Sequence, residues 1–331
     1  MDDIRKILVV RFSSIGDIVL TTPVLRRLHA AYPNASIDYC VKPPFVSLVN
    51  GSPYLNTVYT SAAPPHGHYD MVVDLQNNLR SRSLVKAVSS DRVYRYHKQN
   101  WKKLLLVRTG LNLYRSTDSV VDRYMAALKE QAVEDDDKGC ELWPGDDERA
   151  YASSLLSRTG NSLAVCFGAK HMTKRYPPGK LASVIESLLG ELQLRVFLLG
   201  GAEDMQQADE ILAALAPAAA SRVMNLAGKS SLTQTVAVLE ICDAVLTNDT
   251  GLMHIASAFG KQLFVLFGSS VAEFGFLPYN APYSLFEVAD LACRPCSHIG
   301  RNRCPRGHFK CMMDIPEQSV AEKISDYFKN L

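Results

Sequence analysis

Residues 9–28 form the stretch VVRFSSIGDIVLTTPVLRRL, which joins an apolar strand, a short polar turn and an amphipathic helix. Dinucleotide-binding α/β folds begin with such a unit, and their glycine-rich turn receives a pyrophosphate. Here the turn at 13–17 contains a single glycine, Gly16, and places Asp17 at the start of the helix. A pyrophosphate would meet that carboxylate, so we expect the turn to serve another purpose. Two roles are compatible with Asp17 at this position: a helix cap and a general base.

The rest of the chain alternates strand-like apolar runs with helical patterns, which predicts parallel sheets covered by helices. In the first half the predicted strands are 7–10, 37–41, 71–75 and 92–96, and the predicted helices are 17–32 and 116–131. In the second half the predicted strands are 162–168, 194–201, 244–248, 262–268 and 283–288. The helices predicted there are 179–190, 203–216, 231–241, 251–259 and 316–330. The acidic, turn-rich stretch 134–148 is predicted to link two α/β domains.

The composition is that of a globular protein, because 47% of the 331 residues are hydrophobic and 21% are charged. No apolar run approaches the ~20 residues that span a bilayer. The first ten residues, MDDIRKILVV, carry acids and lack a signal-peptide pattern. We therefore expect a cytoplasmic protein whose eight cysteines stay reduced.

Positive charge is concentrated between residues 80 and 115, where ten Lys/Arg stand against one acid, Asp91. The aromatic residues Tyr94, Tyr96, His97 and Trp101 are interleaved with them. This segment predicts an anionic partner, which is a phosphate group, a membrane surface or a nucleic acid. The alternative is a solvated basic helical face.

Ligands of open α/β sheets bind beyond the carboxyl ends of the strands, and three turns of the second half carry suitable residues. The loop 166–180 places Lys174 and other basic side chains ahead of a helix, where a phosphate is favoured. Glu203 follows a strand and suits ribose hydroxyls. The turn 249–251 opens a helix whose amides would face an anion, and His254 lies one turn further. Each also fits a helix cap, a solvent-exposed turn or a packing residue.

Four cysteines near the C-terminus are spaced as C-x2-C-x7-C-x6-C, which is typical of metal ligands. They are Cys293, Cys296, Cys304 and Cys311, with His298 and His308 as spare candidates. Four thiolates suit zinc, and iron is possible. They would leave no open coordination position, so we expect a structural role. An ordered loop of reduced cysteines, or a redox pair, is the alternative.

Together these segments resemble one known family. ILVVRFSSIGDIVLTTPVLRRL (7–28) resembles the opening of the bacterial ADP-heptose:lipopolysaccharide heptosyltransferases, glycosyltransferase family 9. TNDTGLMHIASAFGKQLFVLFGSS (247–270) resembles their donor-site segment, and TKRYPPGK (173–180) and GGAED (200–204) lie between in the expected order. The resemblance implies the α/β GT-B fold, in which two Rossmann-like domains with parallel sheets face each other across a cleft.

The resemblance also implies a domain plan and a reaction. Residues 1–150 would bind the acceptor, residues 151–315 with the Cys-rich loop 293–311 would bind the nucleotide-sugar, and the helix 316–331 would cross back to the first domain. The implied reaction is inverting transfer of heptose from ADP-heptose to an anionic lipopolysaccharide inner-core acceptor. It needs no organic cofactor and no metal at the diphosphate. The implied location is the cytoplasm, peripheral to the inner membrane face, with no nucleic acid as partner.

Site residues follow from the same resemblance. Asp17 matches the catalytic base, and Lys174 matches the lysine that meets the diphosphate as ADP departs. The donor-binding set is Ser14, Gly16, Thr173, Lys174, Glu203, Asp249, Thr250, Gly251 and His254. Four residues of the basic stretch are assigned to the acceptor: Arg80, Arg82, Lys98 and Lys102.

Three other readings of the sequence stay open. Some relatives that heptosylate proteins carry a four-cysteine iron site, so a protein O-heptosyltransferase with the same donor is the first alternative. A nucleic-acid-binding module would use the basic stretch 80–115 and a cysteine knuckle, but it leaves Asp17 unexplained. A nicotinamide oxidoreductase is disfavoured by the lone Gly16.

Overall fold

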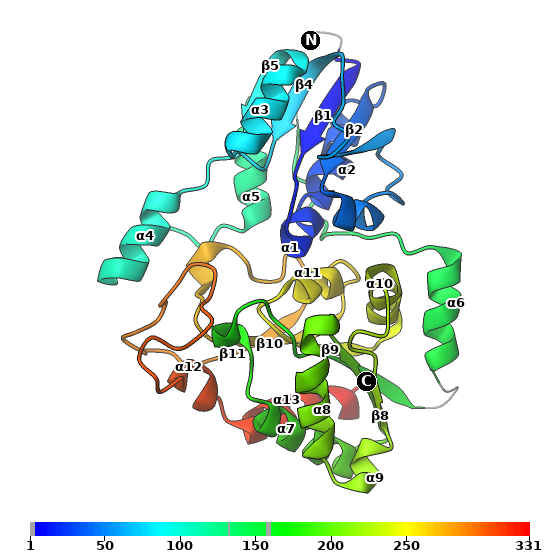
Figure 1. Cartoon of the computed structure of the whole chain (residues 1–331), viewed down its shortest axis with the longest axis vertical. Helices are drawn as coiled ribbons and strands as arrows, with labels where there is room; N and C mark the ends of the chain where they lie inside the picture. Colours follow the sequence, from blue (N-terminus) through cyan, green and yellow to red (C-terminus); the bar gives the residue numbers. More distant parts are fainter. Residues whose placement is uncertain (1–3, 132, 157–159) are drawn as a thin grey trace.

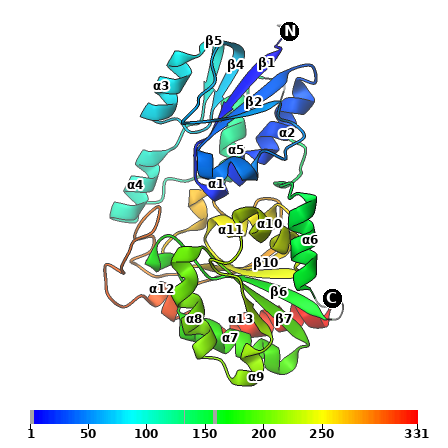
Figure 2. The same ribbon diagram turned by 45° about the vertical axis from the view of Figure 1, so that its right-hand side comes forward.

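The computed structural model describes residues 4–131, 133–156 and 160–331. Over these ranges it contains two parallel β-sheets, one in each half of the chain, with helices packed against them (Figures 1 and 2). The prediction of two parallel-sheet α/β units is confirmed. No helix in the described ranges combines the length and the apolar character that crossing a membrane requires.

The first sheet has the strand order β3-β2-β1-β4-β5. Its strands are β1 (Lys6–Val10), β2 (Ser36–Val41), β3 (Thr57–Thr60), β4 (His68–Asp74) and β5 (Ser89–Arg95). The helices of this half are α1 (Ile15–Val19), α2 (Thr22–Ala31), α3 (Leu79–Ala87), α4 (Asn100–Thr109) and α5 (Val120–Met125), with 3-10 turns η1 (Pro43–Leu48) and η2 (Ala126–Leu128). β1 is central and its apolar run is buried, because both faces of a parallel sheet are covered.

The second sheet has the strand order β11-β10-β9-β6-β7-β8. Its strands are β6 (Asn161–Cys166), β7 (Leu194–Leu199), β8 (Val223–Asn225), β9 (Ala244–Asn248), β10 (Gln262–Phe267) and β11 (Tyr283–Glu287). The longer helices are α6 (Asp146–Leu155), α7 (Pro178–Glu191), α8 (Met205–Ala213), α10 (Leu232–Ile241), α11 (Gly251–Ser257) and α13 (Glu317–Lys329). The short ones are α9 (Pro217–Ala220), α12 (Lys310–Met313), η3 (Met172–Lys174), η4 (Ala202–Asp204) and η5 (Ala272–Phe274).

The elements differ from the predicted ones in several places, and the helices α3, α4 and α6 were not predicted. The predicted helix 17–32 is divided into α1 and α2, and Pro23 in the first turn of α2 explains the break because proline cannot continue a preceding helix. The predicted helix 116–131 is reduced to α5 and η2. The edge strands β3 and β8 were not predicted, because four and three residues are too short for a clear alternation.

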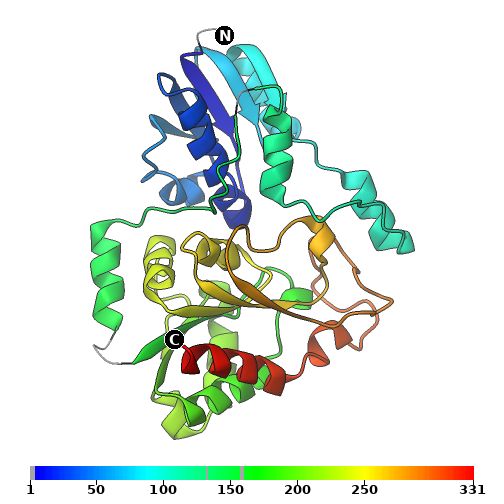
Figure 3. The same ribbon diagram turned by 180° about the vertical axis from the view of Figure 1, so that it is seen from behind.

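The expectation that the final helix crosses back to the first domain is wrong. α13 lies along α7 in the second half (Figure 3). Its apolar stripe of Val320, Ile324 and Phe328 is buried in the core of that half. Glu191 at the end of α7 accepts hydrogen bonds from Ser325 (2.8 Å) and Lys329 (3.0 Å). The stripe is already covered there, so little apolar surface remains to bind the first half.

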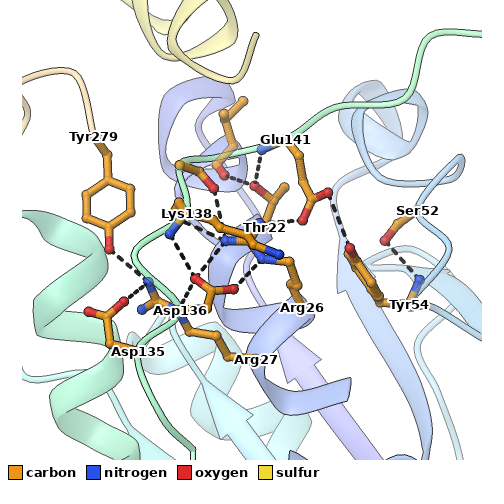
Figure 4. Close-up of polar contacts among 12 residues, drawn as sticks. Thr22, Arg26, Arg27, Ser52, Tyr54, Asp135, Asp136, Lys138, Glu141 and Tyr279 are labelled. Carbon is orange, nitrogen blue, oxygen red and sulfur yellow. Dashed lines mark hydrogen bonds and ion pairs between the residues drawn. The ribbon is translucent and has the colours of Figure 1, made fainter. Parts of the chain in front are cut away.

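The acidic stretch between the halves is bonded to α2 (Figure 4). Asp136 accepts hydrogen bonds from Nε of Arg26 (2.6 Å) and Nε of Arg27 (3.1 Å). Arg26 also binds Glu141, and Arg27 binds Asp135 at 2.5 Å. The hydrogen bond from Arg26 is the main reason that the pKa of Asp136 lies well below its usual range. The chain then enters α6, which packs on α10 of the second half; the division at residue 150 stays a prediction.

A second segment also joins the halves. Residues 273–275, at the end of η5, meet the start of α5: Arg123 donates to the carbonyls of Phe274 (3.0 Å) and Glu273 (2.8 Å). The backbone N–H of Val120 donates to the carbonyl of Gly275 (2.9 Å). A few residues further along, the Tyr279 hydroxyl accepts a hydrogen bond from Arg27 (3.0 Å; Figure 4).

Candidate functional site

Two predicted turns meet where the halves of the molecule touch. α1 follows β1, α11 follows β9, and the two helices pack against each other (Figure 1). A Cβ on Gly16 would lie 2.4 Å from Cδ2 of His254, and one on Gly251 would lie 2.8 Å from Cβ of Ile15. Glycine at both positions therefore permits the close approach. Asp17 on α1 and the turn 249–251 that opens α11 come to the same junction.

Asp17 is the third residue of α1 and is fixed from two sides. Its Oδ1 lies 2.7 Å from NH2 of Arg11, at the end of β1. Its Oδ2 accepts hydrogen bonds from the backbone N–H (3.0 Å) and the hydroxyl (2.9 Å) of Ser14. Burial raises the pKa of Asp17, but the Arg11 charge and the Ser14 hydrogen bonds outweigh it and hold the pKa below its usual value. The carboxylate is ionised at neutral pH, as a base requires, and it also caps the helix.

Arg11 is a site residue that the sequence did not single out. It is 6% exposed and donates to the carbonyls of Ser13 (2.9 Å) and Leu75 (2.7 Å) besides binding Asp17. Its position directly after β1 was a usable signal, because ligands gather at the carboxyl ends of the strands.

Lys174 and Asp249 form an ion pair across two turns of the second half. Nζ of Lys174 lies 2.6 Å from Oδ2 of Asp249, which also accepts a hydrogen bond from the Ser270 hydroxyl. Burial raises the pKa of Asp249, yet the Lys174 charge and these hydrogen bonds bring the pKa below its usual value. The structure thus joins two predicted donor-site residues, and a bound diphosphate would compete with Asp249 for the ammonium group.

Thr173 is almost fully buried and holds Lys174 in place. Its hydroxyl accepts hydrogen bonds from the backbone N–H of Arg301 (2.8 Å) and from the Ser269 hydroxyl (3.0 Å). Its own backbone N–H donates to the Arg301 carbonyl (3.1 Å). The Cys-rich loop is therefore fastened to the residue that precedes Lys174, a long-range link with no sequence signal.

His254 lies beneath α1, where it is 3% exposed. Burial lowers the pKa of His254 to about 4, so the ring is neutral at physiological pH. Its ring centroid lies 6.1 Å from that of Phe276. The ring packs between α1 and Phe276, and its part in donor binding stays a prediction.

The acid predicted to bind ribose is exposed, whereas its neighbour is not. Glu203 lies in η4 with an accessible side chain. Asp204 is buried, pairs with NH2 of Arg175 (2.8 Å) and accepts from the Gly201 N–H (3.0 Å). Asp204 therefore shapes the turn and leaves Glu203 accessible to a ligand.

The basic residues of the first half fall into two groups. Arg80 lines a pocket of about 490 Å³ together with Lys42, His66 and Phe12, beyond the ends of β1 and β2. Arg82 is exposed and donates to Asn77 (3.0 Å), and Lys102 lies over the rings of Trp101 and Tyr114. The pocket residues Lys42 and His66 were missed, because they lie outside the basic stretch.

Two lysines, Lys98 and Lys103, interact electrostatically with Asp17. Burial first, and then the charge of Arg11, lowers the pKa of Lys98. Burial, followed by the charge of Arg123, lowers the pKa of Lys103 to about 8, and Asp17 counters part of this shift. Lys103 is 9% exposed and points inward from α4, which the sequence could not reveal because α4 lacks a clear apolar face.

The four predicted metal ligands line one small cavity of about 20 Å³. Nε2 of His308 lies 3.8 Å from Sγ of Cys293. The sulfurs are spread more widely than a preformed site requires: within the described ranges, three or more His, Cys, Asp or Glu donor atoms lie within 4.8 Å of one another only in the group His68, Asp70 and Asp91. The donor set suits zinc or iron, and binding would draw the sulfurs closer.

Comparisons with known proteins show the family and the fold. The family described as glycosyltransferase family 9 (heptosyltransferase) matches residues 66–304. "Lipopolysaccharide heptosyltransferase 2" of Escherichia coli K12 is 28% identical over 351 residues, 97% of each chain. The solved E. coli ADP-heptose lps heptosyltransferase II has a TM-score of 0.75 at 24% identity, covering 97% of this chain and 98% of that one. The iron-containing dodecameric glycosyltransferase TibC of E. coli H10407 has a TM-score of 0.65 at 14% identity, covering 100% and 77%. The likeness confirms the predicted GT-B fold.

Proposed function

Because the chain belongs to glycosyltransferase family 9, the heptosyltransferase family, we propose that it transfers heptose from ADP-heptose to the inner core of lipopolysaccharide. Relatives named lipopolysaccharide heptosyltransferase 2 match it over nearly their whole length. The observation that carries the proposal is the meeting of Asp17 with the turn 249–251 at the α1–α11 contact.

On this proposal Asp17 is the base. An acceptor hydroxyl attacks the anomeric carbon, its proton passes to a carboxylate oxygen of Asp17, and the bond from that carbon to the diphosphate oxygen breaks. The electron pair leaves with ADP. In-line attack of this kind inverts the anomeric centre.

The negative charge that grows on ADP needs a counter-charge. Lys174 would turn from Asp249 to the diphosphate, aided by the amides of Thr250 and Gly251. Glu203, accessible beside Gly201, would accept hydrogen bonds from the ribose. The acceptor's phosphates and carboxylates would meet Lys98 near Asp17 and Arg80 in the 490 Å³ pocket.

We further propose that the protein works in the cytoplasm, at the periphery of the inner membrane, because the lipid part of such an acceptor lies in a bilayer. No nucleic-acid partner is expected.

We infer that Cys293, Cys296, Cys304 and Cys311 hold a structural zinc or iron ion. Their common cavity supports this, as does the fold shared with an iron-containing glycosyltransferase. Elemental analysis of fresh protein should find close to one equivalent of zinc or iron. A Cys293→Ser, Cys311→Ser variant should lose it, and wild-type protein with less than about a tenth of an equivalent would contradict the site.

The function is tested by offering ADP-heptose with a panel of truncated lipopolysaccharides and following the product by mass spectrometry. Asp17→Asn should lower kcat by roughly 10²–10⁴-fold, while ADP affinity by calorimetry stays within about twofold. Asp209→Asn, which removes an exposed acid on α8, is the matched control and should retain activity. Near-normal turnover of the Asp17 variant refutes the base. Transfer to a protein but to no lipopolysaccharide refutes the acceptor.

A further inference from the structure

The segment 100–115, here called the α4 arm, consists of α4 and the six residues that follow it. It stands at the edge of the molecule, away from both sheets (Figures 1 and 3). Gly110 ends the helix with a φ of +74°, and Asn112 fastens the following residues to Glu273 of the second half (2.8 Å). The arm is therefore held in place although one side of it is open.

Four large apolar side chains of the arm are exposed. The exposed fractions are 61% for Trp101, 50% for Leu104, 53% for Leu111 and 39% for Leu113. Trp101, Leu104 and Arg108 are spaced three and four residues apart, so they share one face of α4. Apolar side chains gathered in this way mark an interaction surface, whereas scattered single ones do not.

The charge of the arm indicates the chemistry of the partner that this surface binds. Between residues 92 and 117 the sequence has seven Lys/Arg and no acid. Arg108 and Arg115 are exposed, and Lys102 lies 5.8 Å from the ring of Trp101. Tryptophan and leucine flanked by arginine and lysine suit the boundary of an anionic bilayer, where rings and alkyl chains enter the interface and cations meet phosphates.

The opposite face of α4 points to the catalytic junction. Lys103 and Leu106 are buried, and Nζ of Lys103 lies 5.7 Å from the ring of Phe276. Asp17 is close enough to influence the pKa of Lys103. One helix thus separates the open apolar surface from the base.

We propose that the α4 arm docks on an anionic, phosphate-bearing lipid surface through Trp101, Leu104, Leu111 and Leu113, with Arg108 and Arg115 meeting the headgroups. The inference deepens the proposed function, on which it rests for the nature of the acceptor. Docking would deliver a lipid-anchored acceptor to the side of α4 that faces Asp17.

Vesicle sedimentation tests the docking surface. Wild-type protein should bind vesicles that contain phosphatidylglycerol, bind phosphatidylcholine vesicles much less, and release as salt is raised. The Trp101→Ser, Leu104→Ser variant should bind at least about tenfold less. Met313→Ser, Leu331→Ser removes two exposed apolar residues elsewhere and is the matched control. Equal binding by both double variants overturns the proposal.

Fluorescence gives a second measurement, because the chain has two tryptophans. In Trp143→Phe protein the emission of Trp101 should shift to the blue on anionic vesicles. A shift that instead follows protein concentration without vesicles would show that a second copy covers the arm, which overturns a lipid partner.

Activity separates this inference from the proposed function. The Trp101→Ser, Leu104→Ser variant should match the wild type on a delipidated core oligosaccharide and fall behind on vesicle-embedded lipopolysaccharide. If the variant and the wild type have equal rates on each of the two acceptors, the docking role is overturned. Failure of the wild type on every acceptor refutes the proposed function, while sedimentation still decides the docking.

Discussion

Replacing Arg11 with glutamine should raise the pKa of Asp17. The change should be measurable as a shift in the pH dependence of heptose transfer. NH2 of Arg11 lies 2.7 Å from the carboxylate, and an opposite charge at such a distance lowers the pKa of a carboxyl group by about 1–3 units. Burial, which pushes the same pKa upward, stays in place in the variant. The pKa should therefore rise from below its usual value, because burial is no longer opposed by the Arg11 charge.

The sign of the effect follows from the role of Asp17. Only the ionised carboxylate accepts a proton, so kcat/KM falls as pH drops through the pKa. The activity of Arg11→Gln should therefore begin to fall at a higher pH than that of the wild type, in which the Arg11 charge holds the pKa of Asp17 below its usual value. The ion pair also stabilises the fold above the pKa of the unfolded carboxyl, and this contribution disappears as pH falls through the lower folded value.

The assay is kcat/KM for ADP-heptose between pH 4 and pH 8. Arg11→Lys is the matched control, because it retains the charge but loses the fork that reaches the carbonyls of Ser13 and Leu75. Losing those bonds costs about 1–3 kcal/mol of stability, so both variants are compared below their melting temperatures. An acid limb that does not move in Arg11→Gln, or that moves equally in Arg11→Lys, would refute the reasoning.

Three further predictions concern other parts of the molecule. Lys174→Met should weaken ADP binding by roughly 10–150-fold in calorimetry, and melting should show a loss of about 3–5 kcal/mol because a buried carboxylate is left unpaired; unchanged affinity would count against its role. Asp136→Asn should lower the free energy of unfolding in denaturant titrations by about 1–2 kcal/mol at pH 7. Its pKa is depressed, so this difference should vanish as pH falls through the folded pKa below 3.8. Gly16→Ala should cost about 1–3 kcal/mol by displacing His254, whereas Gly190→Ala, in open space on α7, should be neutral or stabilising.

The two turns of the candidate site could be expected from the sequence because their positions depend on local rules. An apolar strand followed by a polar turn and a helix places Asp17 at a strand end, and the same pattern places the turn 249–251. Since ligands gather at strand ends, these residues could be expected to lie at a site. The sequence could not show which side chains pair with each other. The ion pair between Lys174 and Asp249 is evident only in the folded structure.

Residues whose role depends on orientation were the ones missed. Lys103 and Lys102 are neighbours in one basic run, yet α4 turns the first inward and lays the second over aromatic rings. The position of the final helix was predicted wrongly for a related reason. Its apolar stripe does not specify a partner, and in the folded chain it packs in the core of the second half, beside α7. Hydrophobic periodicity also did not predict the short edge strands or the division of a helix at a proline.

The contact between residues 273–275 and the start of α5 limits which substitutions this segment can accept in evolution. Arg123 and the N–H of Val120 hold the carbonyls of this segment, so they recognise its backbone. These bonds do not depend on the side chains at positions 273 and 274, which have other contacts: Glu273 binds Asn112 and Phe274 is buried. Position 275 is restricted by its backbone: its φ is +81°, and a Cβ there would lie 2.6 Å from the carbonyl oxygen of Asp118. We expect homologous chains to keep this glycine.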